Sequence, residues 1–387
     1  MRSLVSIRKT AGDDLEGIRE AVRRAADDLG GLEDIIRPGA RVLIKPNMVA
    51  VPEARLSGAV TRWEVCLAAA ELAQEYGGVP VVAESSSVGA DTRDVILFCG
   101  YDHIREAGIP VVDLKTEGGR EYRLSENITT WELVTQADVI ITVPVMKTHD
   151  QCEITLGMKN MKGVMPDSSK KMFHRRGLIE RVIELNRIIK PSLELADGTY
   201  CAEGMGPVFG DTKKKDLIIM SKDIVACESV CGMIMGFRPD EVPVTAAAAE
   251  AGLGTDDLSE IDVAGEKTED VAERFVRSHE TSIEGLPGSF RMIADESACT
   301  GCRNSVMSSL TDMQREGLLG HTEGLTVVAG NAAGAPGRPD PENTVCVGAC
   351  AAEYAQRNGL RIAEGCPPRN NTVVKTMLRG RAEYDYE

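Results

Sequence analysis

Short β-branched runs alternate with helix-like stretches between residues 4 and 264, and this alternation constrains the fold more than any other feature. Strands are predicted at residues 4–8, 41–45, 79–84, 111–114, 138–143, 193–196, 217–220 and 261–264. Helices are predicted at residues 14–29, 63–76, 179–189, 224–235 and 242–251. Alternating strands and helices form parallel βαβ units. The sequence therefore predicts an α/β fold with a doubly wound, mostly parallel sheet.

Four predicted strands run directly into polar segments. These segments are Pro46-Asn47, Ser85-Ser86-Ser87-Val88-Gly89, Pro144-Val145-Met146-Lys147-Thr148-His149 and Asp197-Gly198. Ligands of open α/β sheets bind beyond the carboxyl ends of the strands. We therefore expect the four segments to form loops that share one rim of the sheet.

Cations gather between residues 147 and 176 although the chain carries a net charge of −16. A solvated charged face would explain them, but concentrated cations also attract an anionic ligand. The predicted substrate-binding residues are Lys45, Asn47, Lys147, Lys159, Asn160 and Lys162. Histidine titrates near neutral pH, so His149 and His174 are the predicted proton carriers.

A glycine-rich run spans residues 197–207 and contains two carboxylates, Asp197 and Glu203. They are predicted either to serve as catalytic acid/base groups or to stabilise turns. The chain has no G-x-G-x-x-G, Walker A or G-x-S-x-G motif. No nucleotide loop or serine nucleophile can therefore be assigned.

Five of the eleven cysteines lie in the last ninety residues. Thiolates select zinc or iron–sulfur clusters, and Cys299 and Cys302 form a C-x-x-C pair. We predict a 4Fe–4S cluster held by Cys299, Cys302, Cys350 and Cys366 in a C-terminal α/β iron–sulfur domain. Cys346 is the predicted spare, although it could replace Cys350.

Structural zinc is the main alternative to a cluster, but a zinc ribbon usually has a second C-x-x-C pair. With three protein ligands, one iron would stay open to substrate. Isolated cysteines are predicted to be small core residues: Cys66, Cys99, Cys152, Cys227 and Cys231. Cys201, in the glycine-rich run, is left unassigned.

The chain has 387 residues, enough for two domains. A linker at Gly285-Leu286-Pro287-Gly288 predicts a substrate-binding domain over 1–284 and a cysteine-rich domain over 289–387. The acidic charge and 4% aromatic content argue against nucleic-acid binding. No signal-peptide pattern or long apolar run is present, so we expect a cytoplasmic protein without membrane association.

Several motifs resemble domain-of-unknown-function family 362, whose members include uncharacterised iron–sulfur-centre proteins. The motifs are Ile44-Lys45-Pro46-Asn47-Met48-Val49, Val145-Met146-Lys147-Thr148-His149, Thr155-Leu156-Gly157-Met158-Lys159-Asn160-Met161-Lys162-Gly163 and Glu203-Gly204-Met205-Gly206-Pro207. The resemblance covers about residues 1–265 and implies no particular reaction. Many relatives carry a ferredoxin-like segment with denser cysteines, and this chain departs from that pattern. Gly365-Cys366-Pro367-Pro368 is similar to a cluster loop in small subunits of respiratory complex I and nickel–iron hydrogenases.

Three functions are consistent with these features. The first is a cytosolic iron–sulfur oxidoreductase that acts on a small anionic molecule and exchanges electrons with a partner such as a ferredoxin. The second is a non-redox cluster enzyme, such as a lyase, a dehydratase or a sulfur-handling enzyme with an open iron. The third is a cluster carrier or electron-transfer partner without enzymatic activity. The oligomeric state, including a homo-oligomer, stays open.

Overall fold

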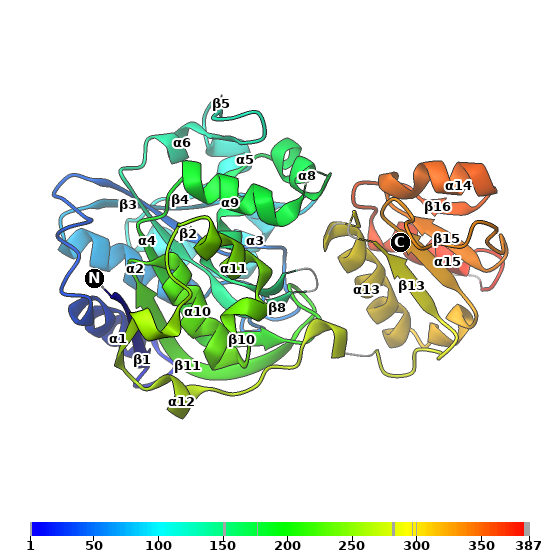
Figure 1. Ribbon diagram of the computed structural model, residues 1–387. Helices are drawn as coiled ribbons and strands as arrows, with labels where there is room; N and C mark the ends of the chain where they lie inside the picture. Colours follow the sequence, from blue (N-terminus) through cyan, green and yellow to red (C-terminus); the bar gives the residue numbers. More distant parts are fainter. Residues whose placement is uncertain are drawn as a thin grey trace. The chain divides into compact units, whose positions relative to one another are not determined.

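The computed structural model describes residues 2–149, 152–175, 177–280, 283–295, 297–298 and 300–382. The chain divides into two compact units, Met1–Glu280 and Thr281–Glu387. The predicted linker at residues 285–288 lies just inside the second unit. The first unit has a large, mostly parallel sheet and the second a small parallel sheet, which confirms the predicted α/β class (Figure 1).

The first unit is built on a ten-stranded sheet whose main path runs β12-β1-β11-β10-β7-β2-β3-β4. Its strands are β1 (Ser3–Lys9), β2 (Arg41–Pro46), β3 (Val79–Glu84), β4 (Val111–Asp113), β7 (Val139–Val143), β8 (Val145–His149), β9 (Glu153–Thr155), β10 (Leu193–Glu203), β11 (Asp211–Ser221) and β12 (Ile261–Gly265). A separate hairpin pairs β5 (Glu121–Arg123) with β6 (Thr129–Trp131). The neighbours β10, β7, β2, β3 and β4 are parallel, whereas β11 is antiparallel to both of its neighbours.

Helices cover both faces of this sheet, as expected for a doubly wound fold (Figure 1). The longer helices are α1 (Leu15–Asp28), α2 (Trp63–Glu75), α3 (Thr92–Phe98), α8 (Asp167–Arg175), α9 (Leu178–Ile188), α10 (Ile224–Met235) and α11 (Pro243–Glu250). The shorter ones are α4 (Asp102–Glu106), α5 (Leu114–Glu117), α6 (Glu132–Thr135), α7 (Gly157–Asn160) and α12 (Thr268–Val271). In β2, Val42 and Ile44 join the core with α1 and α2, whereas Leu43 joins the core with α9 and α11. Side chains alternate between the two faces of a strand, so the middle of this central strand, Val42–Ile44, is apolar on both faces.

The second unit has a four-stranded parallel sheet in the order β13-β14-β15-β16. Its strands are β13 (Arg291–Ala294), β14 (Thr326–Ala329), β15 (Thr344–Val347) and β16 (Arg361–Ala363). Its helices are α13 (Thr300–Arg315), α14 (Ala352–Asn358) and α15 (Asn370–Leu378). One core lies between the sheet and helices α13 and α15, and a smaller core lies under α14.

Two of the four predicted rim loops are in fact strands. The segment after β7 continues at once as β8, and β10 runs on past Asp197 to Glu203. β8 pairs in parallel with the extension of β10, so each strand satisfies backbone groups of the other. Only the segments after β2 and β3 are loops as predicted. Short polar sequences gave no sign of this extra pairing, because it depends on residues far apart in the chain.

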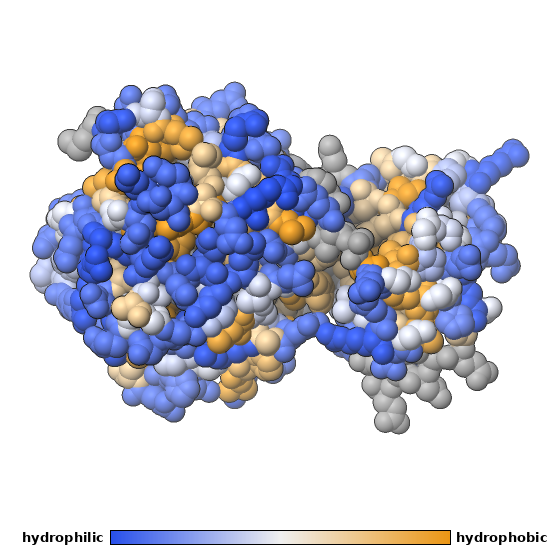
Figure 2. Space-filling model, turned by 90° about the horizontal axis from the view of Figure 1, so that it is seen from below, coloured by the Kyte–Doolittle hydropathy of each residue, from blue (hydrophilic) through white to orange (hydrophobic). Residues whose placement is uncertain are grey.

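The molecular surface drawn in Figure 2 is mostly hydrophilic, with hydrophobic patches scattered over it. Large exposed apolar side chains include Val79 and Leu97. Within the described residues, no helix combines the length and apolar character that a membrane crossing needs.

Candidate functional site

The cysteines of the second unit follow the carboxyl ends of three parallel strands. Cys302 lies in the first turn of α13, after β13, while Cys350 follows β15 and Cys366 follows β16. Parallel strands end at one edge of a sheet, so the thiols of Cys302, Cys350 and Cys366 all follow strand ends at the same edge. Cys299, the fourth predicted ligand, lies outside the described residues.

Backbone contacts join the loops that carry these thiols. Ala349 N donates to Gly365 O at 2.9 Å, and Gly348 N donates to Ala363 O at 3.0 Å. Gly348 has φ +88° and ψ 156°, a conformation almost confined to glycine. A side-chain carbon at Gly348 would overlap Cys302 Sγ. The end of β15 therefore contacts both the α13 thiol and the loop of Cys366.

Cys346 differs from the other cysteines of this unit because it lies within β15 rather than after it. It is fully buried and packs with Val328, Ala351 and Ala355 under α14. Burial raises the pKa of the Cys346 thiol to about 11, which favours the protonated form. Cys350 and Cys366 are half-buried. This arrangement is consistent with Cys346 as the spare cysteine.

Within the described part of the chain, no three His, Cys, Asp or Glu side chains are grouped closely enough to hold a metal ion. Cys299 lies outside that part of the chain. The cluster and its four ligands therefore stay a prediction.

In the first unit, most of the predicted substrate-binding residues form a buried network. Lys45 Nζ lies 2.5 Å from Glu84 Oε2, 2.8 Å from Asn160 Oδ1 and 2.5 Å from Pro46 O. Asn47 Nδ2 donates to the same Asn160 oxygen at 3.2 Å. Burial lowers the pKa of Lys45, and the adjacent Glu84 opposes that shift. These three predicted residues are brought together, but in the interior rather than on an open rim.

Lys147 extends this network from β8. Its Nζ donates to Asn47 Oδ1 at 2.9 Å, Ala59 O at 2.5 Å and Pro207 O at 3.0 Å. Three acceptors match the three donors of an ammonium group. Burial lowers the pKa of Lys147 well below its usual value, and Lys159 lowers it further. A ligand could contact Lys147 only by displacing one of these protein acceptors.

Lys170 is a buried lysine that the sequence prediction missed. Its Nζ donates to Ser85 O, to Ser85 Oγ at 2.7 Å and to Ser86 O at 2.7 Å. It therefore attaches α8 to the loop after β3. Burial lowers the pKa of Lys170 to about 7. The basic composition of residues 147–176 was a signal for this lysine, but nothing in it indicated the serine partners.

The predicted acid/base residues occupy different surroundings. Asp197 is fully buried and accepts hydrogen bonds from Arg62 N at 2.9 Å and from Thr199 N and Oγ1 at 3.0 and 2.6 Å. Burial raises the pKa of Asp197, and these hydrogen bonds oppose the rise. Glu203 lies at the far end of β10 in an ion pair with Lys213, at 3.1 Å. The two carboxylates therefore do not form one catalytic pair.

The remaining predicted residues are His149, His174, Lys159 and Lys162, and the three whose side chains are described differ in burial. Lys159 and Lys162 are half-buried, and Lys162 Nζ lies 5.9 Å from the centre of the Phe173 ring. His149 is buried at the end of β8. The side chain of His174 lies outside the described residues.

Two buried glutamates that the sequence prediction missed meet at the start of α7. Glu194 accepts from Gly157 N at 3.0 Å, and Glu228 accepts from Met158 N at 2.7 Å and from Thr245 Oγ1 at 2.9 Å. Burial raises the pKa of Glu228 to about 7 and raises that of Glu194 well above its usual value. The proximity of Glu228 raises the Glu194 pKa further. This pair supports α7, which carries Asn160 into the lysine network.

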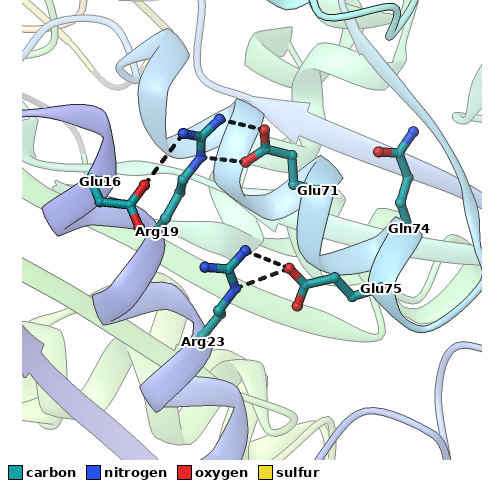
Figure 3. A pocket seen from close by; sticks show the side chains of 6 residues that line it. All are labelled: Glu16, Arg19, Arg23, Glu71, Gln74 and Glu75. Atoms are coloured by element: carbon teal, nitrogen blue, oxygen red, sulfur yellow. Dashed lines mark hydrogen bonds and ion pairs between the residues drawn. The ribbon is translucent and has the colours of Figure 1, made fainter.

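A surface hollow of about 510 Å³ lies between α1 and α2 (Figure 3). Arg19 forms a two-bond ion pair with Glu71 at 2.6 and 2.7 Å, and Arg23 binds Glu75 at 2.6 and 2.9 Å. The charges that line the hollow are thus paired with one another. It is a salt-bridged groove between two helices, and it contains none of the predicted site residues.

A family model described as "Domain of unknown function (DUF362)" matches residues 42–232. A thylakoid-associated protein of Synechocystis sp. is 34% identical over 227 residues, which are 56% of this chain and 70% of that protein. The chain belongs to the DUF362 family. This confirms the family that the sequence motifs indicated. The DUF362 match contains the lysine network and ends before the second unit begins.

Among solved structures, the lactate racemase apoprotein from Thermoanaerobacterium thermosaccharolyticum is similar, with a TM-score of 0.39 and 9% sequence identity. The similarity covers 98% of this chain and 91% of that one.

Proposed function

We propose that this DUF362 protein is a cytosolic iron–sulfur oxidoreductase whose second unit holds a 4Fe–4S cluster. Cys299, Cys302, Cys350 and Cys366 are the proposed ligands. The observation that carries the proposal is the return of Cys302, Cys350 and Cys366 to one edge of a parallel sheet. The loops of the last two are joined by the bond from Ala349 N to Gly365 O.

The residue types at this edge fit the chemistry of an iron–sulfur centre. Soft thiolates are the usual ligands of such clusters. Cys302 lies in the first turn of the sixteen-residue helix α13, where the helix dipole stabilises a thiolate and an anionic group. Gly348, with no side chain, lets Cys302 Sγ lie close to the backbone at the end of β15. When bound, a cluster would supply one-electron transfer.

The proposed substrate is a small anionic molecule, and its contacts fall to the half-buried Lys159 and Lys162. Lys45, Asn47, Lys147 and Asn160 already bind one another and other protein atoms, so their role is to hold the strand ends in place. Lys159 lowers the pKa of Lys147, which indicates that its charge lies near this network. A protein redox partner such as a ferredoxin would exchange electrons with the cluster.

Iron content of cysteine variants tests the proposal. Iron and acid-labile sulfide would be measured in anaerobically purified wild-type protein and in the Cys299→Ala, Cys302→Ala, Cys350→Ala and Cys366→Ala variants. The matched control is Cys346→Ala, which removes a buried thiol of the same unit. We expect about four irons and four sulfides in the wild type and in the control. We expect each of the four ligand variants to lose most of its iron.

Other results would redirect the proposal. Zinc without acid-labile sulfide would contradict it and make the second unit a structural zinc domain. An intact cluster in one of the four ligand variants, with Cys346→Ala also intact, would indicate three protein ligands and thus favour an open-iron lyase or dehydratase. An intact cluster in Cys350→Ala together with iron loss in Cys346→Ala would make Cys346 the fourth ligand. A stable cluster without any effect of Lys159→Ala and Lys162→Ala on binding of small carboxylates or phosphates would favour the electron carrier.

A further inference from the structure

Helix α13 carries a row of hydroxyl groups on the same face as Cys302. Ser305 and Ser309 follow Cys302 by three and seven residues, a spacing that places all three on one side of a helix. Both serines are buried. Serine is a modest helix former and is more often found at caps and turns, so burial of two in the middle of a helix needs partners.

The partner of Ser305 lies in the segment that follows Cys366. Ser305 Oγ donates to Pro368 O at 2.8 Å. Ser309 Oγ donates to Ser305 O within the helix at 2.6 Å and lies 3.2 Å from Asn370 O. The Asn370 side chain in turn donates to Ser308 Oγ. The helix that begins with one proposed ligand therefore holds the segment after another.

Proline explains why the hydroxyl group matters here. Pro367 and Pro368 have no backbone N–H, so the segment directly after Cys366 can be fixed only through its carbonyl oxygens. Ser305 supplies a donor to one of those oxygens. On the other side of Cys366, Gly365 O accepts from Ala349 N. Hydrogen bonds thus hold the chain both before and after the Cys366 thiol.

We infer that Ser305 is a positioning residue for the cluster, which fixes the Cys366 loop relative to Cys302 through Pro368 O. This inference rests on the proposed function. Some side chains orient metal ligands by hydrogen bonds without binding the metal themselves. Their removal typically lowers metal affinity by about 10–100-fold. Hydrogen bonding around the ligands also tunes the reduction potential of iron–sulfur clusters. Ser305 would therefore affect both retention of iron and the potential.

The test compares Ser305→Ala with Thr311→Ala in the full-length protein. Thr311 Oγ1 donates to Met307 O within α13, so its loss removes a helix hydroxyl that does not touch the Cys366 segment. The measurements are the rate of iron loss to a chelator, the EPR g-values after dithionite, and the midpoint potential. We expect Ser305→Ala to lose iron about tenfold faster than wild type, with changed g-values and a shifted potential. Thr311→Ala should match wild type in all three.

A second variant covers the case in which Ser305→Ala does not fold. Ser309 Oγ contacts both Ser305 O and Asn370 O, so Ser309→Ala disturbs the same connection indirectly, and its changes should have the same direction and be smaller. If Ser305→Ala folds and matches Thr311→Ala, or if Ser305→Ala does not fold and Ser309→Ala matches Thr311→Ala, the inference is overturned and the proposed cluster stands. If iron and sulfide are absent from all the proteins, wild type included, the proposed function fails and the inference fails with it.

Discussion

The carboxyl ends of parallel strands carry very different chemistry in the two units. In the first unit, Lys45 and Lys147 are fully buried, and each Nζ has three protein acceptors. In the second unit, Cys350 and Cys366 are half-buried and follow strands of four and three residues. The first edge is closed by its own side chains, whereas the second presents thiols on short loops.

Strand ends that meet at one edge of a sheet can therefore either bind one another or present groups to a ligand. A charged group at a strand end binds a ligand only if the protein leaves some of its donors unused. Protein acceptors already bind the ammonium groups of Lys45 and Lys147, so the main effect of these two lysines is on stability and on the shape of the edge. Thiols make weak hydrogen bonds and strong metal bonds, so cysteines at a strand end indicate a metal more directly.

The largest expected effect comes from breaking the closed edge with Glu84→Gln. Glu84 is the carboxylate that binds the buried Lys45 ammonium, at 2.5 Å. Removal of one partner leaves an uncompensated buried charge, which typically costs about 3–5 kcal/mol of unfolding free energy. Urea unfolding of the variant measures this loss. An unchanged unfolding midpoint would contradict the view that the first edge is held by its own charges.

The second prediction concerns Gly348→Ala at the thiol edge. The new side chain would overlap Cys302 Sγ and would force a non-glycine residue into φ +88°. We expect a loss of roughly 3 kcal/mol together with loss of iron. The control is Gly359→Ala, also at positive φ but with no atom within 4 Å of the added carbon. It should cost about 1 kcal/mol and keep its iron, as judged by thermal unfolding and iron analysis.

A smaller effect is expected from Glu228→Gln and depends on pH. The folded protein holds a proton on Glu228 up to about pH 7, whereas the unfolded chain releases it near the ordinary pKa of 4.5. The folded pKa is raised, so the stability contributed by this proton is present below pH 4.5 and is lost as the pH rises through 7. Glutamine should remove this decline, so the variant should be more stable than the wild type at pH 8, by up to about 3 kcal/mol. Unfolding at pH 5 and pH 8 tests the sign, and equal differences at both values would contradict it.

The smallest effect belongs to Glu75→Gln, which serves as the surface counterpart of Glu84→Gln. Glu75 pairs with Arg23 on the half-exposed rim of the groove between α1 and α2. Exposed ion pairs contribute about 0–1 kcal/mol, and salt screens them. We expect a change below about 1 kcal/mol in urea unfolding, and a smaller one at high salt. A loss as large as that of Glu84→Gln would remove the distinction between buried and exposed pairs.

Much of the first unit could be predicted because its signals are local. Helix α10 and strand β3 occupy the predicted residues, since apolar periodicity and β-branched runs depend only on neighbouring positions. β8 and the extension of β10 were missed because their pairing joins Lys147 to Ala202 across the sheet. The short strands β13, β15 and β16 were missed because three or four residues give little pattern.

The candidate site residues could also be predicted only where local sequence decides their position. Local sequence features singled out Cys302, Cys350 and Cys366, and all three follow strands that end at one edge of the sheet. Spacing could not indicate that Lys45 would be enclosed, because Glu84 and Asn160 lie 39 and 115 positions away. The Glu194–Glu228 pair also depends on a contact between a strand and a helix that no local pattern encodes.

The measurement that tests the central claim most directly is EPR of the anaerobically purified wild-type protein, before and after dithionite. The account predicts no signal before reduction and, after it, a signal from one reduced 4Fe–4S cluster that integrates to about one spin per chain. A protein with bound zinc, no acid-labile sulfide and no signal on reduction would contradict the claim that the thiol edge is a redox centre.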